Sequence, residues 1–151
     1  MSASFGRVEP IEILLVEDNP GDVRLTREAL GEAKVHNRLS VAATGREALE
    51  HLGLAPHQAT DEGARPDLVL LDLNLPDMSG HDVLVRIKED PGLQEIPVVI
   101  LTSSEAEGDV ARSYREHANA YVTKPVDLDG LARIVRSIDG FWFSVVRLPT
   151  R

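Results

Sequence analysis

Cysteine is absent from the 151-residue chain, which excludes disulfides, thiol nucleophiles and cysteine-ligated metals. This absence is compatible with a reducing cytoplasm. Basic side chains are also scarce, because 16 Lys and Arg stand against 25 Asp and Glu and give a net charge of -9. Nucleic-acid binding needs basic side chains that displace counterions, and anionic membranes repel an acidic protein. We therefore expect neither nucleic acid nor a membrane as a partner.

Long apolar runs are missing as well. No uninterrupted apolar stretch approaches the ~20 residues of a membrane span. The start, MSASFGRVEP, lacks a basic segment followed by an apolar one, so it is not typical of a signal peptide, and we predict a cytoplasmic protein with residues 1–10 as a flexible lead-in. The hydrophobic content of 42% and charged content of 27% are those of an ordinary globular domain.

Short apolar segments alternate with helical patterns over residues 11–139. The predicted strands are 11–16, 38–43, 67–72, 97–102 and 120–122, and the predicted helices are 20–33, 45–54, 80–89, 105–117 and 127–139. Residues 55–66 are expected to form a loop. The first, third and fourth strands are continuous apolar runs, which indicates an α/β domain with a parallel sheet covered by helices on both faces.

In the stretch VLLDLNLPDMSG, residues 69–80, an apolar run typical of a buried strand is followed directly by the carboxylate of Asp72. Desolvating a lone carboxylate is costly, so another group must compensate it. Glu17 and Asp18 end the first predicted strand, at the same edge where parallel sheets bind ligands. Repulsion among three carboxylates is relieved by a hard divalent cation such as Mg²⁺, and Lys124 brings a positive charge to the same rim.

The histidines suggest no metal site. They lack a spacing such as H-x-x-x-H, and all five are predicted at the surface: His36, His51, His57, His81 and His117.

Together these motifs resemble the receiver domain of two-component response regulators. The resemblance covers residues 11–139 and rests on Glu17-Asp18, Asp72, Thr102-Ser103 and Lys124-Pro125, each after a predicted strand. It implies a doubly wound, flavodoxin-like (βα)5 fold with five parallel strands in the order 2-1-3-4-5.

The resemblance also implies a phosphoryl-accepting site. Asp72 would take a phosphoryl group from a histidine kinase. Asp18, Asp72 and the backbone carbonyl of Asn74 would ligate Mg²⁺, with Glu17 acting through a water molecule. The protein would be no enzyme beyond assisting its own phosphorylation and dephosphorylation.

Further roles follow from the same resemblance. Lys124 would hold a phosphate oxygen, Thr102 would move toward the acyl phosphate, and Tyr121 would turn inward as a switch. The Lys124-Pro125 peptide bond would be cis. Asn74 and Ser104 would flank the path of hydrolytic water and tune dephosphorylation.

Within this family, the sequence is most similar to the stand-alone, phytochrome-associated response regulators. The similarity lies in the LLDLNLP core, the long loop before the third strand and the closing DGFWFSVVRLP. It implies a light-sensing histidine kinase as partner and a homodimer. Too few residues follow Lys124 for an output domain, so the expected output is protein binding. The tail, residues 140–151, is predicted to form the dimer or partner contact through Phe141, Trp142, Phe143, Val145 and Val146, unless it folds back onto its own domain.

Other functions stay open at this stage. A chemotaxis-type regulator or a phosphate-sink receiver would use the same site. An Mg²⁺-dependent phosphohydrolase of the haloacid-dehalogenase type would carry D-x-D after the first strand, whereas Asp72 follows the third and Asn74 stands in place of the second aspartate. A dinucleotide-binding domain is disfavoured because no G-x-G-x-x-G follows a strand.

Overall fold

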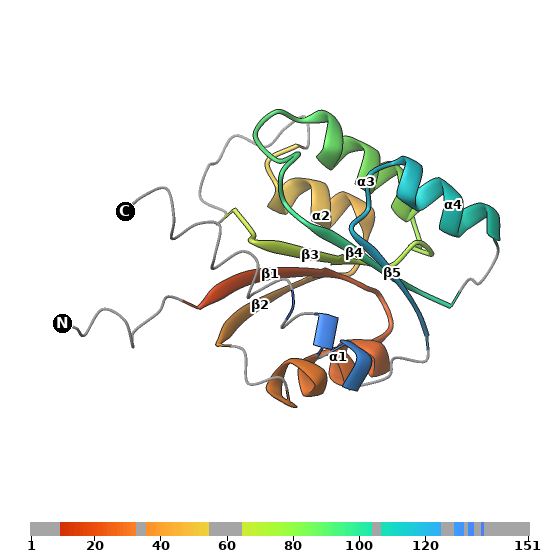
Figure 1. The fold of residues 1–151 in the computed structure, drawn as a ribbon. Coiled ribbons are helices and arrows are strands. Elements are labelled where there is room, and N and C mark those ends of the chain that lie inside the picture. The colour runs from red at the N-terminus through yellow and green to blue at the C-terminus, as the bar shows by residue number, and fades with distance from the viewer. Residues whose placement is uncertain are drawn as a thin grey trace.

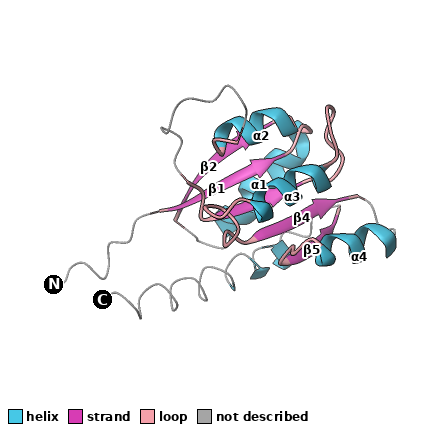
Figure 2. Cartoon of the chain, turned by 90° about the horizontal axis from the view of Figure 1, so that it is seen from above, coloured by secondary structure: helices cyan, strands magenta, loops and turns pink. Residues whose placement is uncertain are grey.

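The computed structural model describes residues 10–32, 36–54, 65–103, 107–124, 129–131, 133–134 and 137. Five parallel strands form one sheet in the order β2-β1-β3-β4-β5, as predicted (Figure 1). The elements are β1 (Ile11–Val16), α1 (Pro20–Glu32), β2 (Asn37–Ala42), α2 (Gly45–His51), β3 (Leu68–Leu71), α3 (Gly80–Glu89), β4 (Val98–Thr102), α4 (Glu107–Arg115) and β5 (Ala120–Thr123). Helices α2, α3 and α4 cover one face of the sheet and α1 the other (Figures 1 and 2).

Side chains that alternate along the central strands divide the core in two. In β1, Leu14 and Val16 pack beneath α2 and α3, whereas Ile13 and Leu15 belong to the cluster on the α1 side. This is the two-residue period of a strand buried on both faces. Leu131, at 0% exposure, joins the second cluster, so the described part of the predicted last helix packs beside α1. That helix is described only at 129–131, 133–134 and 137, all of them helical.

Local capping explains where the helices begin. Asn19 Oδ1 accepts hydrogen bonds from the backbone N–H groups of Gly21 and Asp22 at 2.8 and 3.1 Å, and Pro20 occupies the first position of α1. Thr44 caps α2 by accepting a bond of 3.0 Å from the Glu47 N–H. These are the start positions that the sequence predicts.

Two predicted helices are too long at their carboxyl ends. α2 ends at His51 rather than residue 54, because Gly53 follows with φ of 76° and leaves the helical conformation. α4 ends at Arg115 rather than residue 117, and His117 has φ of 74°. A residue with a left-handed backbone conformation ends a helix abruptly, and the periodicity of apolar side chains does not reveal where this happens.

The surface prediction is wrong for His81. This side chain, in the first turn of α3, is 3% exposed. Its Nδ1 lies 2.8 Å from Glu116 Oε1 and its Nε2 lies 3.4 Å from Asp109 Oδ1. Burial of His81 is tolerated because each ring nitrogen has a carboxylate partner from the α4 region. Of the other histidines, His36 and His117 are exposed and His51 is partly buried, while His57 lies outside the described residues.

Other predictions also lie outside the described residues: the lead-in up to residue 9, Ser104, Pro125 and the tail from residue 140. Within the part that the structure does describe, no helix is long and apolar enough to span a membrane.

Candidate functional site

The candidate site lies at the carboxyl edge of the sheet, where β1 and β3 end side by side. Val16 pairs with Leu71 in the parallel register, so the residues that follow each strand are neighbours. The Asp72 N–H also donates to the Val16 carbonyl at 3.0 Å. One carboxylate oxygen from each of Glu17, Asp18 and Asp72 lies within 4.8 Å of the others. The structure thus brings the three predicted carboxylates together.

Burial makes this cluster electrostatically costly. Glu17 is 2% exposed and Asp72 is 5% exposed, whereas Asp18 is open to solvent. Burial, together with a smaller effect of the Asp72 charge, raises the pKa of Glu17 to about 7 against the opposing effect of Lys124. A divalent cation with a preference for oxygen ligands would relieve both the desolvation and the repulsion. The donor set, three carboxylates with one of them at the surface, fits such an ion.

Lys124 is a cation that Glu17 and Asp72 share with a further carboxylate, Asp22. Its Nζ donates to Glu17 Oε1 at 2.7 Å, Asp22 Oδ2 at 2.7 Å and Asp72 Oδ2 at 3.2 Å. Burial alone would lower the pKa of Lys124, but the bonds to Asp22 and Glu17 outweigh it and raise that pKa above its usual range. The Lys124 N–H donates to the Thr102 carbonyl at 2.7 Å, which places the lysine just beyond β5.

Asp22 is a site residue that the sequence analysis missed. It is the third residue of α1, where an acidic side chain is ordinarily explained by the helix dipole. The available signal was its place in the first turn of the helix that begins shortly after Asp18, which favours the same edge of the sheet.

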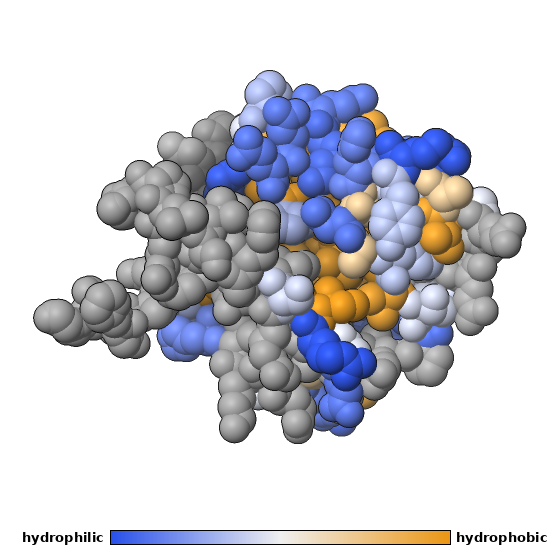
Figure 3. All heavy atoms as spheres, viewed as in Figure 1, coloured by the Kyte–Doolittle hydropathy of each residue, from blue (hydrophilic) through white to orange (hydrophobic). Residues whose placement is uncertain are grey.

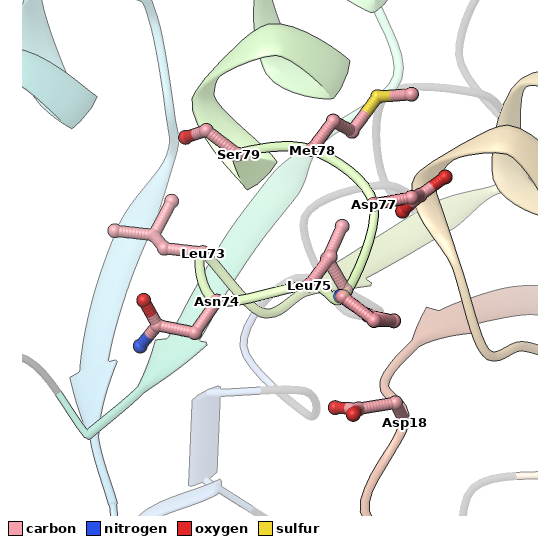
Figure 4. Close-up of a pocket in the computed structure, with 8 residues that line it drawn as sticks. Asp18, Leu73, Asn74, Leu75, Asp77, Met78 and Ser79 are labelled. Atoms are coloured by element: carbon pink, nitrogen blue, oxygen red, sulfur yellow. The ribbon is translucent and has the colours of Figure 1, made fainter.

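The loop between β3 and α3 forms the other wall of the site. Asn74 N–H donates to Asp72 Oδ1 at 3.0 Å, and its side-chain amide lies 3.4 Å from Thr102 Oγ1. Residues 73–79 and Asp18 line an open hollow of about 530 Å³. Figure 4 shows the side chains of Asn74 and Asp77 pointing away from each other on this loop.

Asp77 ties the loop to α2. Its two carboxylate oxygens accept from the backbone N–H groups of Gly45 at 2.8 Å and Arg46 at 3.0 Å. Desolvation tends to raise the pKa of Asp77, but these backbone hydrogen bonds outweigh it and lower that pKa. The sequence offers little to find this contact, since the partners are more than 30 residues apart.

Two further predicted residues lie on the neighbouring strands. Thr102 ends β4 and is fully buried, and Tyr121 lies on β5 opposite Ile100 in the register. Tyr121 is partly buried and packs against the core cluster beneath α3. Thr102 is therefore on the strand next to the one that leads to Asp72, and Tyr121 is on the edge strand beyond it.

The fold and this carboxyl-edge site are those of a receiver domain. The pattern of the response regulator receiver domain family matches residues 13–136, and the chain belongs to that family. Response regulator Rcp1 of Synechocystis sp. is 42% identical over 140 residues, which cover 93% of this chain and 94% of Rcp1. The family resemblance seen in the sequence is thereby confirmed.

Solved structures of response regulators resemble this chain in fold and in sequence. The phosphorylated cyanobacterial phytochrome response regulator RcpA superimposes with a TM-score of 0.76 at 44% identity, covering 94% of this chain and 100% of that one. The Mn²⁺-bound form of Rcp1 gives a TM-score of 0.74 at 41% identity, covering 94% and 97%. The chain therefore has phytochrome-associated relatives, as its sequence suggested.

Proposed function

We propose that this protein is a response regulator that accepts a phosphoryl group on Asp72 with the help of Mg²⁺. The observation that carries the proposal is the environment of Asp72: a buried carboxylate within reach of two further carboxylates and hydrogen-bonded to Lys124 Nζ at 3.2 Å. In the transfer, a carboxylate oxygen of Asp72 forms the new P–O bond while the P–N bond of a phosphohistidine breaks and the freed imidazole takes up a proton.

The residues that would hold Mg²⁺ are Asp18, Asp72 and the backbone carbonyl of Asn74, with Glu17 acting through water. The ion would neutralise charge on the phosphoryl oxygens, which is the main help that phosphoryl transfer requires. Support comes from the carboxylate cluster and from Rcp1, whose structure was solved with Mn²⁺ bound.

The response to phosphorylation would run through the neighbouring strands. Lys124 would bind a phosphoryl oxygen, Thr102 would move toward it, and Tyr121 would follow as the switch. Asn74, which is exposed at the site, and Ser104 would tune the access of hydrolytic water. The contact between the Asn74 amide and Thr102 Oγ1 supports a coupling of these positions.

We further propose a phytochrome-type histidine kinase as the partner, a cytoplasmic location and signalling by altered protein binding rather than by an enzymatic output. The phytochrome-associated relatives support the choice of kinase. A homodimer would form through the tail, beside β5 and the last helix. In support, all four residues of β5 are partly exposed, and Figure 3 shows apolar side chains reaching the surface below the hydrophilic upper layer. The tail itself contains the only tryptophan and two of the three phenylalanines.

The test is labelling by a small phosphodonor in Mg²⁺. The parent should take up one phosphoryl group, and Asp72→Asn should take up none because an amide cannot act as the nucleophile. Undiminished labelling of Asp72→Asn would overturn the assignment. A phosphotransfer profile against the histidine kinases of the source organism would then identify the donor.

The dimer is tested separately. Deleting residues 141–151 should give a folded monomer that still accepts phosphate. Sedimentation of the full-length protein decides the matter, since a monomer at all concentrations, with or without phosphate, contradicts the proposal.

A further inference from the structure

Lys124 has no hydrogen-bond donor to spare. An ammonium group has three N–H donors, and Glu17, Asp22 and Asp72 accept one each. The bonds to Glu17 and Asp22, at 2.7 Å, are shorter than the bond to Asp72, at 3.2 Å. If Lys124 is to bind a phosphoryl oxygen, it must therefore give up one of these three carboxylates.

The three carboxylates differ in what a metal ion can do to them. Glu17 and Asp72 belong to the group whose oxygens could hold an ion together, and Asp22 does not. A bound cation would weaken the hold of Glu17 and Asp72 on the lysine by taking up part of their charge. Asp22 would keep its full charge, and so would remain the acceptor that retains Lys124.

We propose that Asp22 competes with the phosphoryl group for Lys124 and thereby limits how tightly the site holds that group. This inference rests on the proposed function and deepens it. Asp22 is a positioning residue here: it acts through Lys124 and bonds to no other atom of the cluster. Removing its carboxylate frees one donor of Lys124, so the phosphorylated form of the site becomes more stable.

The local structure allows a clean substitution at Asp22. Its other described contacts use the backbone: its N–H donates to Asn19 Oδ1, and its carbonyl accepts from Thr26 Oγ1 at 2.8 Å. Among the described residues, Asp22→Ala therefore removes one side-chain hydrogen bond, the one from Lys124, besides the charge in the first turn of α1. A matched control is Asp82→Ala, because Asp82 is also the third residue of its helix, is exposed, and is absent from the contacts of Lys124.

The experiment measures binding of beryllium trifluoride, a phosphoryl mimic that attaches to a carboxylate, at saturating Mg²⁺. We expect Asp22→Ala to bind it up to about fivefold more tightly than the parent, the factor for losing one partly exposed competing ion pair. Asp82→Ala should bind it like the parent. Mg²⁺ alone should bind no more tightly to Asp22→Ala than to the parent, because the change removes a negative charge near the site.

Two measurements separate this competition from a mere loss of charge. In a Lys124→Ala background, Asp22→Ala should add no gain, since the two residues would act as one pair. In ~1 M salt, where the screening length is only about 3 Å, the gain should persist because the contact is direct. Unchanged or weaker mimic binding by Asp22→Ala, or a gain that survives without Lys124 or vanishes in salt, overturns the inference. Failure of the parent to bind the mimic would instead contradict the proposed function.

Discussion

The start of α3 is packed directly against the backbone of the proposed phosphoacceptor, and Gly80→Ala tests that contact. A Cβ at Gly80 would lie 2.2 Å from the Asp72 carbonyl oxygen and 2.7 Å from Leu73 Cα. Both are backbone atoms, so no side-chain rotation can make room. The Gly80 N–H also donates to the Leu73 carbonyl at 2.8 Å, which holds the helix close to the loop.

The expected cost follows from this geometry. Overpacking a buried position lowers the free energy of unfolding by about 1–3 kcal/mol. A clash with backbone belongs at the upper end of this range, so we expect Gly80→Ala to lower the free energy of unfolding by about 3 kcal/mol. For a domain of this size that corresponds to a fall in Tm of roughly 6–12 °C. Because the clash displaces Asp72 itself, Mg²⁺ binding should weaken as well.

Urea unfolding followed by circular dichroism measures the first effect, and titration calorimetry with Mg²⁺ measures the second. Gly31→Ala in α1 is the matched control, since nothing among the described residues lies within 4 Å of its new Cβ. It should leave Mg²⁺ binding unchanged and stabilise the helix by up to about 1 kcal/mol. If Gly80→Ala were as stable as the parent and bound Mg²⁺ equally well, the close contact would be refuted.

Four further predictions concern charged groups. His81→Leu should lower the free energy of unfolding by about 1–3 kcal/mol, because it leaves Glu116 Oε1 without its hydrogen-bond partner while Arg112 stays on Oε2; an unchanged urea midpoint would contradict this. Lys124→Ala should lower the free energy of unfolding of the metal-free protein by about 3 kcal/mol, because it leaves buried carboxylates without their cation. Mg²⁺ should restore most of that stability in the same unfolding assay. The pKa of Glu17, raised by burial from 4.5 to about 7, means that the folded chain binds this proton more tightly than the unfolded chain. Metal-free protein should therefore gain stability as pH falls from about 7 toward 4.5, and Glu17→Gln should remove that gain. The lowered pKa of Asp77 has the opposite effect: the carboxylate stabilises the folded protein above pH 3.8, and this stabilisation is lost at lower pH. Asp77→Ala should therefore destabilise the protein at pH 7 but not in strong acid.

The sequence predicts the parts of this molecule that depend on short-range pattern. The apolar runs of β1, β3 and β4 are continuous because helices cover both faces of the sheet. Such runs indicate parallel strands, and parallel strands bring Glu17, Asp18 and Asp72 to one edge of the sheet. The helix starts at Pro20 and Gly45 follow from the caps before them.

Contacts between distant segments could not be predicted in the same way. The burial of His81 depends on carboxylates 28 and 35 residues further along the chain, and its own neighbours look like an ordinary polar helix start. Asp22 meets Lys124 across 102 residues, and only the folded sheet brings the start of α1 and the residue after β5 together. For both residues the chemistry was visible in the sequence, but the partner was not.

The central claim, phosphoryl transfer to Asp72, is tested most directly by identifying the modified residue. An acyl phosphate on an aspartate is reduced by borohydride to homoserine, which mass spectrometry of peptides can locate. Protein treated with phosphodonor and Mg²⁺ should yield homoserine at position 72, and omission of Mg²⁺ should suppress it. Homoserine at Asp18 or Asp22 instead, or none at all in protein that carries a phosphoryl group, would contradict the account.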